Sequence, residues 1–143
     1  MMKFNNILVV CVGNICRSPM AEYLLRESFP DRTIHSAGIQ GVVGHGADEK
    51  AMYCMSSIGI DMQAHKARKL NDDLVKTADL ILVMSQNQLK HVEQTWPFAK
   101  GKTFRLGHWQ SKNIADPYQH DQSFFNDTFE LIQSCVNDWK KQI

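Results

Sequence analysis

The sequence contains no run of apolar residues that approaches the roughly 18 needed to cross a membrane. It also lacks the pattern of a signal peptide, because the apolar run that follows Lys3 is short and leads directly into a polar, glycine-containing segment. Both absences predict a cytoplasmic protein with no direct membrane insertion.

Charge of one sign is also scarce. The formal net charge of the 143 residues is +1, which argues against a general binder of nucleic acid or of membrane surfaces. The sequence has no internal repeat, low-complexity segment or domain linker. With 43% apolar and 22% charged residues over this length, we expect residues 1–143 to form one globular domain with an ordinary core.

Cysteine is limited to four residues: Cys11, Cys16, Cys54 and Cys135. In a reducing compartment these residues do not form a disulfide framework. No C-x2-C pair or H-x3-H partner accompanies them, so the sequence predicts no metal site and no cofactor. Cys54 and Cys135 lie on the apolar faces of expected helices, and we expect both to pack in the core.

Segments typical of strands and of helices alternate along the chain. The expected strands cover residues 7–11, 33–37, 80–84 and 103–106. The expected helices cover about 19–28, 47–58, 71–77, 85–96 and 123 to near the C-terminus. This alternation predicts an α/β fold, with a four-stranded parallel sheet, helices on both faces and a phosphate-binding loop after the first strand. Ligands bind such sheets beyond the carboxyl ends of the strands.

That loop is the most informative stretch of the sequence: Cys11-Val12-Gly13-Asn14-Ile15-Cys16-Arg17-Ser18. A turn between a strand and a helix can direct backbone N–H groups inward, where the helix N-terminus also attracts anions. Arg17 offers a planar pair of donors that matches two phosphate oxygens. The same positive field favours a nucleophilic thiolate at Cys11, and Ser18 can donate a hydrogen bond to that sulfur. The pattern predicts phosphoryl transfer with a cysteine nucleophile.

A phosphatase of this kind also needs an acid that protonates the departing oxygen. Asp116 is the best candidate, because Pro117 restricts its backbone and helps to fix where the carboxyl group points. Tyr118 can form a wall against an aromatic substrate. In isolation, Asp116-Pro117-Tyr118 would be read as a turn.

Two further residues are candidates for support of the loop. Asn14 needs hydrogen-bond partners if it is held in a strained conformation, and Ser36 and His65 can supply them. The basic residues Lys66, Arg68 and Lys69 are expected to form a solvated face.

The sequence resembles the low-molecular-weight protein tyrosine phosphatases almost from end to end. The resemblance rests on residues 11–22, Ser36-Ala37-Gly38, His65-Lys66-Ala67-Arg68-Lys69-Leu70 and Asp116-Pro117-Tyr118. It implies that Cys11 attacks phosphotyrosine, that Arg17 and the loop amides hold the phosphate, and that Asp116 is the acid. The residues that the resemblance places around the substrate are Val12, Gly13, Asn14, Ile15, Cys16, Ser18, Val42 and Tyr118. It also implies that Asn14, Ser36 and His65 form a supporting network, and that Cys16 traps oxidised Cys11 as a reversible disulfide.

Residues 43–48 and 106–109 look like those of the bacterial capsule and exopolysaccharide branch. That resemblance implies a phosphotyrosine protein as substrate, namely the tyrosine-rich tail of a membrane-bound tyrosine autokinase. Val42 stands where eukaryotic members have a large aromatic residue, and Gln119 stands where they have a second tyrosine. Both differences affect the expected stacking and peptide preference rather than the chemistry.

Three other functions fit this sequence less well. Arginine phosphatases of the same family carry Thr in place of Ile15, and an isoleucine offers no hydroxyl that could position a nucleophile. An arsenate reductase on this fold needs a relay pair of cysteines after the third strand, and residues 84–97 contain none. An inactive phosphopeptide-binding module predicts the loss of Cys11, Arg17 or Asp116, and all three are present.

Overall fold

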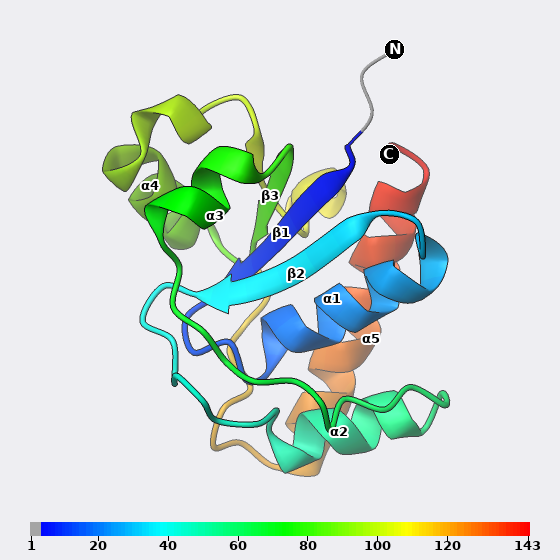
Figure 1. Ribbon diagram of the computed structural model, residues 1–143. Helices are drawn as coiled ribbons and strands as arrows, with labels where there is room; N and C mark the ends of the chain where they lie inside the picture. Colours follow the sequence, from blue (N-terminus) through cyan, green and yellow to red (C-terminus); the bar gives the residue numbers. More distant parts are fainter. Residues whose placement is uncertain (1–3) are drawn as a thin grey trace.

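A four-stranded parallel sheet forms the centre of the computed structural model, which describes residues 4–143 (Figure 1). The strand order is β2-β1-β3-β4. The strands are β1 (Asn6–Cys11), β2 (Thr33–Gly38), β3 (Leu80–Val83) and β4 (Thr103–Arg105). The α/β fold with a parallel sheet, expected from the alternation of segments, is confirmed.

The helices cover both faces of this sheet. They are α1 (Arg17–Ser28), α2 (Glu49–Ser56), α3 (Asp72–Thr77), α4 (Gln86–Thr95) and α5 (Gln122–Lys140). Figure 1 shows α1 and α5 on one side of the sheet, α3 and α4 on the other, and α2 beside the end of α5. No helix of residues 4–143 is long and apolar enough to cross a membrane.

The two faces follow from the alternation of side chains along β1. Ile7 and Val9 belong to the core cluster under α1 and α5, whereas Leu8 and Val10 belong to the cluster under α3 and α4. All four side chains are completely buried. A continuously apolar strand is therefore explained by burial on both faces.

Helix boundaries follow local capping chemistry. Asp48, Asn71, Ser85 and Asp121 each accept a hydrogen bond from a backbone N–H in the first turn of the helix that follows. The expected start of the first helix at Pro19 was two residues late, because α1 begins at Arg17. Proline is tolerated there, since the N–H groups of a first turn have no partner within the helix.

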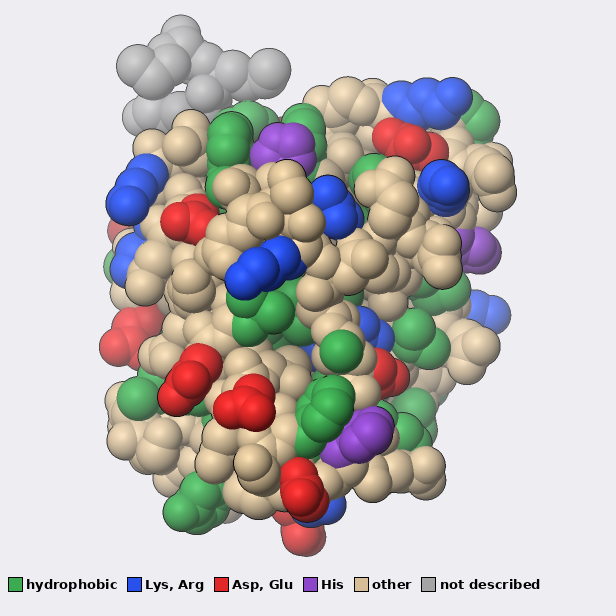
Figure 2. All heavy atoms as spheres, turned by 180° about the vertical axis from the view of Figure 1, so that it is seen from behind, with side chains coloured by type: hydrophobic (Ala, Val, Ile, Leu, Met, Phe, Trp, Pro, Cys, Tyr) green, Lys and Arg blue, Asp and Glu red, His purple; other side chains and the backbone are tan. Residues whose placement is uncertain are grey.

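The surface agrees with the low net charge. On the face seen in Figure 2, basic and acidic side chains are interspersed and do not gather into one large patch of a single sign.

The fold brings two loops together at one edge of the sheet. β1 and β2 end side by side at Cys11 and Gly38. The loop after Cys11 and the loop after Gly38 therefore leave the same edge of the sheet.

Candidate active site

The loop between β1 and α1 turns sharply at Asn14, whose φ is +62°. This left-handed conformation is uncommon for a residue other than glycine. The side chain of Asn14 is completely buried, and its backbone N–H lies 3.3 Å from Cys11 Sγ. Close approach also matters at Gly38, where a Cβ atom would lie 2.5 Å from the Val12 carbonyl oxygen. Glycine at position 38 thus allows the second strand to pack against the loop.

The partners of the Asn14 side chain show which of its amide atoms accepts hydrogen bonds and which donates them. Its Oδ1 accepts from the backbone N–H of Arg68 at 3.0 Å, so Nδ2 is the donor to Ser18 Oγ and to Ser36 Oγ, each at 2.8 Å. The His65 Nε2 donates to the Asn14 carbonyl oxygen at 2.7 Å. The supporting contacts expected of Ser36 and His65 are therefore present.

The hydrogen bond from Asn14 determines how the Ser18 hydroxyl interacts with Cys11 Sγ. Because Ser18 Oγ already accepts from Asn14, its hydroxyl proton is free to point toward Cys11 Sγ, which lies 2.9 Å away. Together with the Asn14 N–H, the sulfur has two hydrogen-bond donors. Donors of this kind stabilise a negatively charged sulfur.

The network extends to a residue that the sequence reasoning left without a role. Ser36 Oγ donates to Glu22 Oε1, and Glu22 Oε2 pairs with Arg26 at 2.7 Å. Glu22 is almost fully buried. The i,i+4 spacing of Glu22 and Arg26 on α1 was the available signal.

Arg68 makes contacts that the sequence did not predict. Lys66, Lys69 and Arg68 are exposed, as expected of a solvated face, but Arg68 also makes two hydrogen bonds to β2. Its Nε donates to the Ser36 carbonyl oxygen at 3.0 Å, and its Nη2 donates to His35 Nδ1 at 2.8 Å. Burial and the nearby arginines lower the pKa of His35, which favours the neutral ring that accepts this bond.

Arg17 reaches from the start of α1 to the segment that carries the expected acid. Its Nη1 donates to the Ile114 carbonyl oxygen at 2.8 Å, and its Nη2 lies 3.6 Å from Asp116 Oδ2. Arg17 Nε is buried and has no hydrogen-bond partner within residues 4–143. The guanidinium is thus held in place and still has a donor available to an oxyanion.

Asp116 and Tyr118 flank Pro117 in the segment that precedes α5. Pro117 between them is buried, while both flanking side chains are exposed. The Tyr118 N–H donates to Asp116 Oδ1 at 3.1 Å. This contact and the Arg17 pair orient the carboxyl group toward the loop of Cys11.

A cavity of about 190 Å³ brings most of the predicted site together. It is lined by Cys11, Val12, Gly13, Ile15, Cys16, Arg17, Gln40, Val42, Asp116 and Tyr118. Asn14, Ser18, Ser36 and His65 are buried and do not belong to this lining. Gln40 was missed by sequence reasoning, because the register of the loop after β2 against the site could not be read from its composition.

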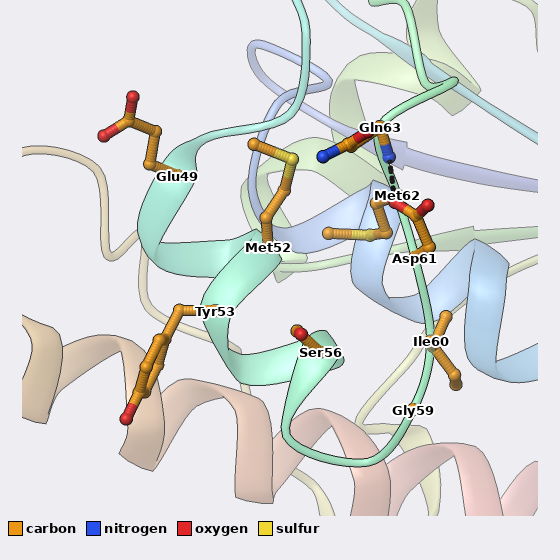
Figure 3. Close-up of a pocket in the computed structure, with 9 residues that line it drawn as sticks. All are labelled: Glu49, Met52, Tyr53, Ser56, Gly59, Ile60, Asp61, Met62 and Gln63. Atoms are coloured by element: carbon orange, nitrogen blue, oxygen red, sulfur yellow. Dashed lines mark hydrogen bonds between the residues drawn. The ribbon is translucent and has the colours of Figure 1, made fainter.

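A larger cavity, of about 510 Å³, lies between α2 and residues 59–63 (Figure 3). Its lining includes Glu49, Met52, Tyr53 and Asp61 but no cysteine or arginine. It therefore offers neither the predicted nucleophile nor the predicted phosphate-binding group, both of which line the smaller cavity. Size alone does not identify the reactive site.

The remaining cysteines are buried. Burial, followed by the charges of Asp48, Cys11 and Asp116, raises the pKa of the Cys16 thiol far above its usual value. Burial raises the pKa of Cys135 to about 11. Cys54 and Cys135 lie in the core as expected. Within residues 4–143, no group of three or more His, Cys, Asp or Glu side chains could hold a metal ion.

Known proteins are similar to this chain in both sequence and fold. The low-molecular-weight protein-tyrosine-phosphatase Ptp of Acinetobacter johnsonii is 72% identical over 142 residues, covering 99% of this chain and 100% of the relative. The structure of Vibrio vulnificus Wzb in complex with benzylphosphonate is 38% identical and superimposes with a TM-score of 0.94, covering 99% of this chain and 100% of the other.

An arginine phosphatase, YwlE from Geobacillus stearothermophilus, is also similar in structure. It is 28% identical, with a TM-score of 0.90, over 96% of this chain and 91% of the other. The model of the family "Low molecular weight phosphotyrosine protein phosphatase" matches residues 6–143. The chain therefore belongs to the low molecular weight phosphotyrosine protein phosphatases.

Proposed function

We propose that this enzyme hydrolyses phosphotyrosine in proteins, with Cys11 as nucleophile, Arg17 as the phosphate-binding group and Asp116 as the general acid. The observation that carries the assignment is that these three side chains line one cavity. Beside this cavity, Ser18 and the Asn14 N–H direct hydrogen bonds at Cys11 Sγ.

In the first step the Cys11 thiolate attacks phosphorus in line with the bond to the tyrosine oxygen. The S–P bond forms as the P–O bond breaks, and Asp116 transfers its proton to the departing phenolate oxygen. The guanidinium of Arg17 and the backbone N–H groups of the loop stabilise the charge on the three equatorial oxygens.

In the second step the cysteinyl-phosphate is hydrolysed. The Asp116 carboxylate takes a proton from water, and the resulting oxygen attacks phosphorus as the S–P bond breaks. Ser18 lies 2.9 Å from the sulfur, so its hydroxyl stabilises the thiolate as it leaves. The products are inorganic phosphate and the free enzyme.

The cavity walls favour an aromatic substrate. Tyr118 and Val42 are half-exposed at the opening, and Ile15 lies beside the nucleophile. These side chains offer apolar contact to the ring of a phosphotyrosine. Ile15 has no hydroxyl for a planar guanidinium phosphate, which supports phosphotyrosine over phosphoarginine even though an arginine phosphatase shares the fold.

The finer assignment concerns the partner. The resemblance of residues 43–48 and 106–109 to the capsule and exopolysaccharide branch supports a membrane-bound tyrosine autokinase as the substrate. Its tyrosine-rich tail would be dephosphorylated in the cytoplasm. The enzyme would thereby control capsule or exopolysaccharide export.

A substrate trap tests both levels of this proposal. The Cys11→Ser variant should retain a phosphotyrosine protein from lysate of the source cells, and mass spectrometry should identify a tyrosine autokinase. Cys54→Ser is the matched control, because Cys54 is buried away from the cavity and hydrogen-bonds Asn126. The wild-type enzyme should cleave phosphotyrosyl peptides and spare phosphoarginyl peptides. Preferential cleavage of phosphoarginine would refute the activity, and retention of a different phosphoprotein would refute only the partner.

A further inference from the structure

The proposed acid, Asp116, lies in a segment whose backbone makes few hydrogen bonds to the rest of the molecule. At one end, the Ile114 N–H donates to the Met84 carbonyl oxygen at 2.8 Å. At the other end, Asp121 caps α5. Within residues 4–143, the backbone of residues 115–120 has one hydrogen bond to a group outside the segment, and Lys50 supplies it.

That bond joins Lys50 Nζ to the His120 carbonyl oxygen at 2.7 Å. The neighbouring residue Gln119 has a φ of +67°, a left-handed conformation that is strained for a side chain of this type. A segment with such a turn keeps its shape only when its surroundings hold it. Lys50 acts at the residue that directly follows the turn.

Lys50 is itself anchored on two sides. Its carbonyl oxygen accepts from Gln122 Nε2 at 3.2 Å, and its ammonium group lies 5.7 Å from the centre of the Phe125 ring. The His120 ring stacks on Phe124 with centroids 4.2 Å apart. Residues of helix α2 and of the first turn of α5 thus both contact the end of the segment that carries Asp116.

The same helix also touches the nucleophile loop. The Asp48 N–H, at the N-cap of α2, donates to the Ile15 carbonyl oxygen at 2.8 Å. Two residues later, Lys50 holds His120. The start of α2 therefore bridges the loop that carries Cys11 and the segment that carries Asp116.

We propose that Lys50 is a positioning residue that sets the placement of Asp116 for proton transfer. The inference rests on the proposed role of Asp116 as the acid. Lys50 does not line the catalytic cavity, so its effect passes through the His120 carbonyl and the backbone between residues 116 and 120.

A role through Asp116 makes a specific kinetic prediction. Lys50→Met keeps a long apolar side chain beside Phe125 but removes the donor. It should lower kcat/KM, which reports cleavage of the P–O bond, about tenfold for phosphotyrosine-like esters, the scale of one hydrogen bond to a charged group. Aryl phosphates with strongly acidic leaving groups depart without a proton, and their kcat/KM should change less than about twofold.

Three companion variants separate this role from general damage. Lys50→Arg keeps a cationic donor and should restore most of the rate for basic leaving groups. Lys90→Met removes an exposed lysine from α4 and should leave both substrates unaffected. Lys50→Leu also removes the donor and gives a second test should the methionine variant fold poorly, which a thermal melt would reveal.

The decisive comparison is a double-mutant cycle with Asp116→Asn. If Lys50 acts through the acid, adding Lys50→Met to Asp116→Asn should cause no further loss for basic leaving groups. Multiplicative losses, or an equal loss of kcat/KM for both substrate classes, would overturn the proposal. If Asp116→Asn alone leaves the leaving-group dependence unchanged, the acid assignment fails and the role of Lys50 fails with it. If only Lys50→Met has no effect, the proposed function stands and Lys50 is excluded.

Discussion

Replacement of Asn14 tests whether the buried network holds the nucleophile loop. Asn14→Ala removes both bonds from Nδ2 to the serines and the bond that Oδ1 accepts from the Arg68 N–H. It also places alanine at a φ of +62°.

The expected cost can be worked from these contacts. An Arg68 N–H left without its partner costs about 1.5 kcal/mol, and alanine in the left-handed region costs about 1.5 kcal/mol more. Because the bonds to the two serine hydroxyls are lost in addition, Asn14→Ala should lower the free energy of unfolding by at least about 3 kcal/mol. Asn14→Gly loses the same hydrogen bonds without the strain, so it should be less destabilised by about 1.5 kcal/mol.

Urea unfolding of the two variants and the wild type measures this difference. The kcat of both variants should fall, because Ser18 loses the bond that directs its hydroxyl toward Cys11. Equal stability of Asn14→Ala and Asn14→Gly would refute the argument from strain. Wild-type kcat in both would refute the argument that the network orients Ser18.

Three further outcomes follow from the site. Arg17→Lys should lose most of its activity toward phosphotyrosyl peptide, since a single ammonium cannot reproduce the planar pair of donors; a KM and kcat near the wild type would contradict this role. Peroxide should inactivate the enzyme and dithiothreitol should restore it, with poorer recovery in Cys16→Ser because the thiol that resolves oxidised Cys11 is missing; equal recovery would exclude the protective disulfide. Asp116→Asn should slow esters with basic leaving groups by about 10²–10³-fold and steepen the plot of log rate against leaving-group pKa; an unchanged slope would assign the proton to another residue.

Sequence patterns were sufficient for the fold and the reactive loop because both are local. The continuous apolar run at 7–11 is explained by burial on two faces, and the loop motif spans only eight residues. Asp116 is predicted to be the acid from its proline and from the resemblance. Its pairing with Arg17 across the cavity is a tertiary contact.

The residues that were missed act over long sequence separations. Lys50 contacts His120, which is 70 positions away, and neither residue carries a local motif. Arg68 was assigned to a solvated face because it belongs to a run of basic residues, and its side chain is exposed as that assignment predicts. Its contacts with Ser36 and His35 depend on how residues 64–70 lie along the edge of β2, which no periodicity indicates.

The formation of a phosphorylated cysteine tests the central claim most directly. Asp116→Ala should slow hydrolysis of the cysteinyl-phosphate, because no carboxylate remains to take a proton from water. Rapid acid quenching of this variant with an aryl phosphate whose strongly acidic leaving group departs without a proton, followed by mass spectrometry, should find one phosphoryl group on the peptide that contains Cys11. Release of the phenol at times when no phosphoryl group is found on Cys11 would contradict the account.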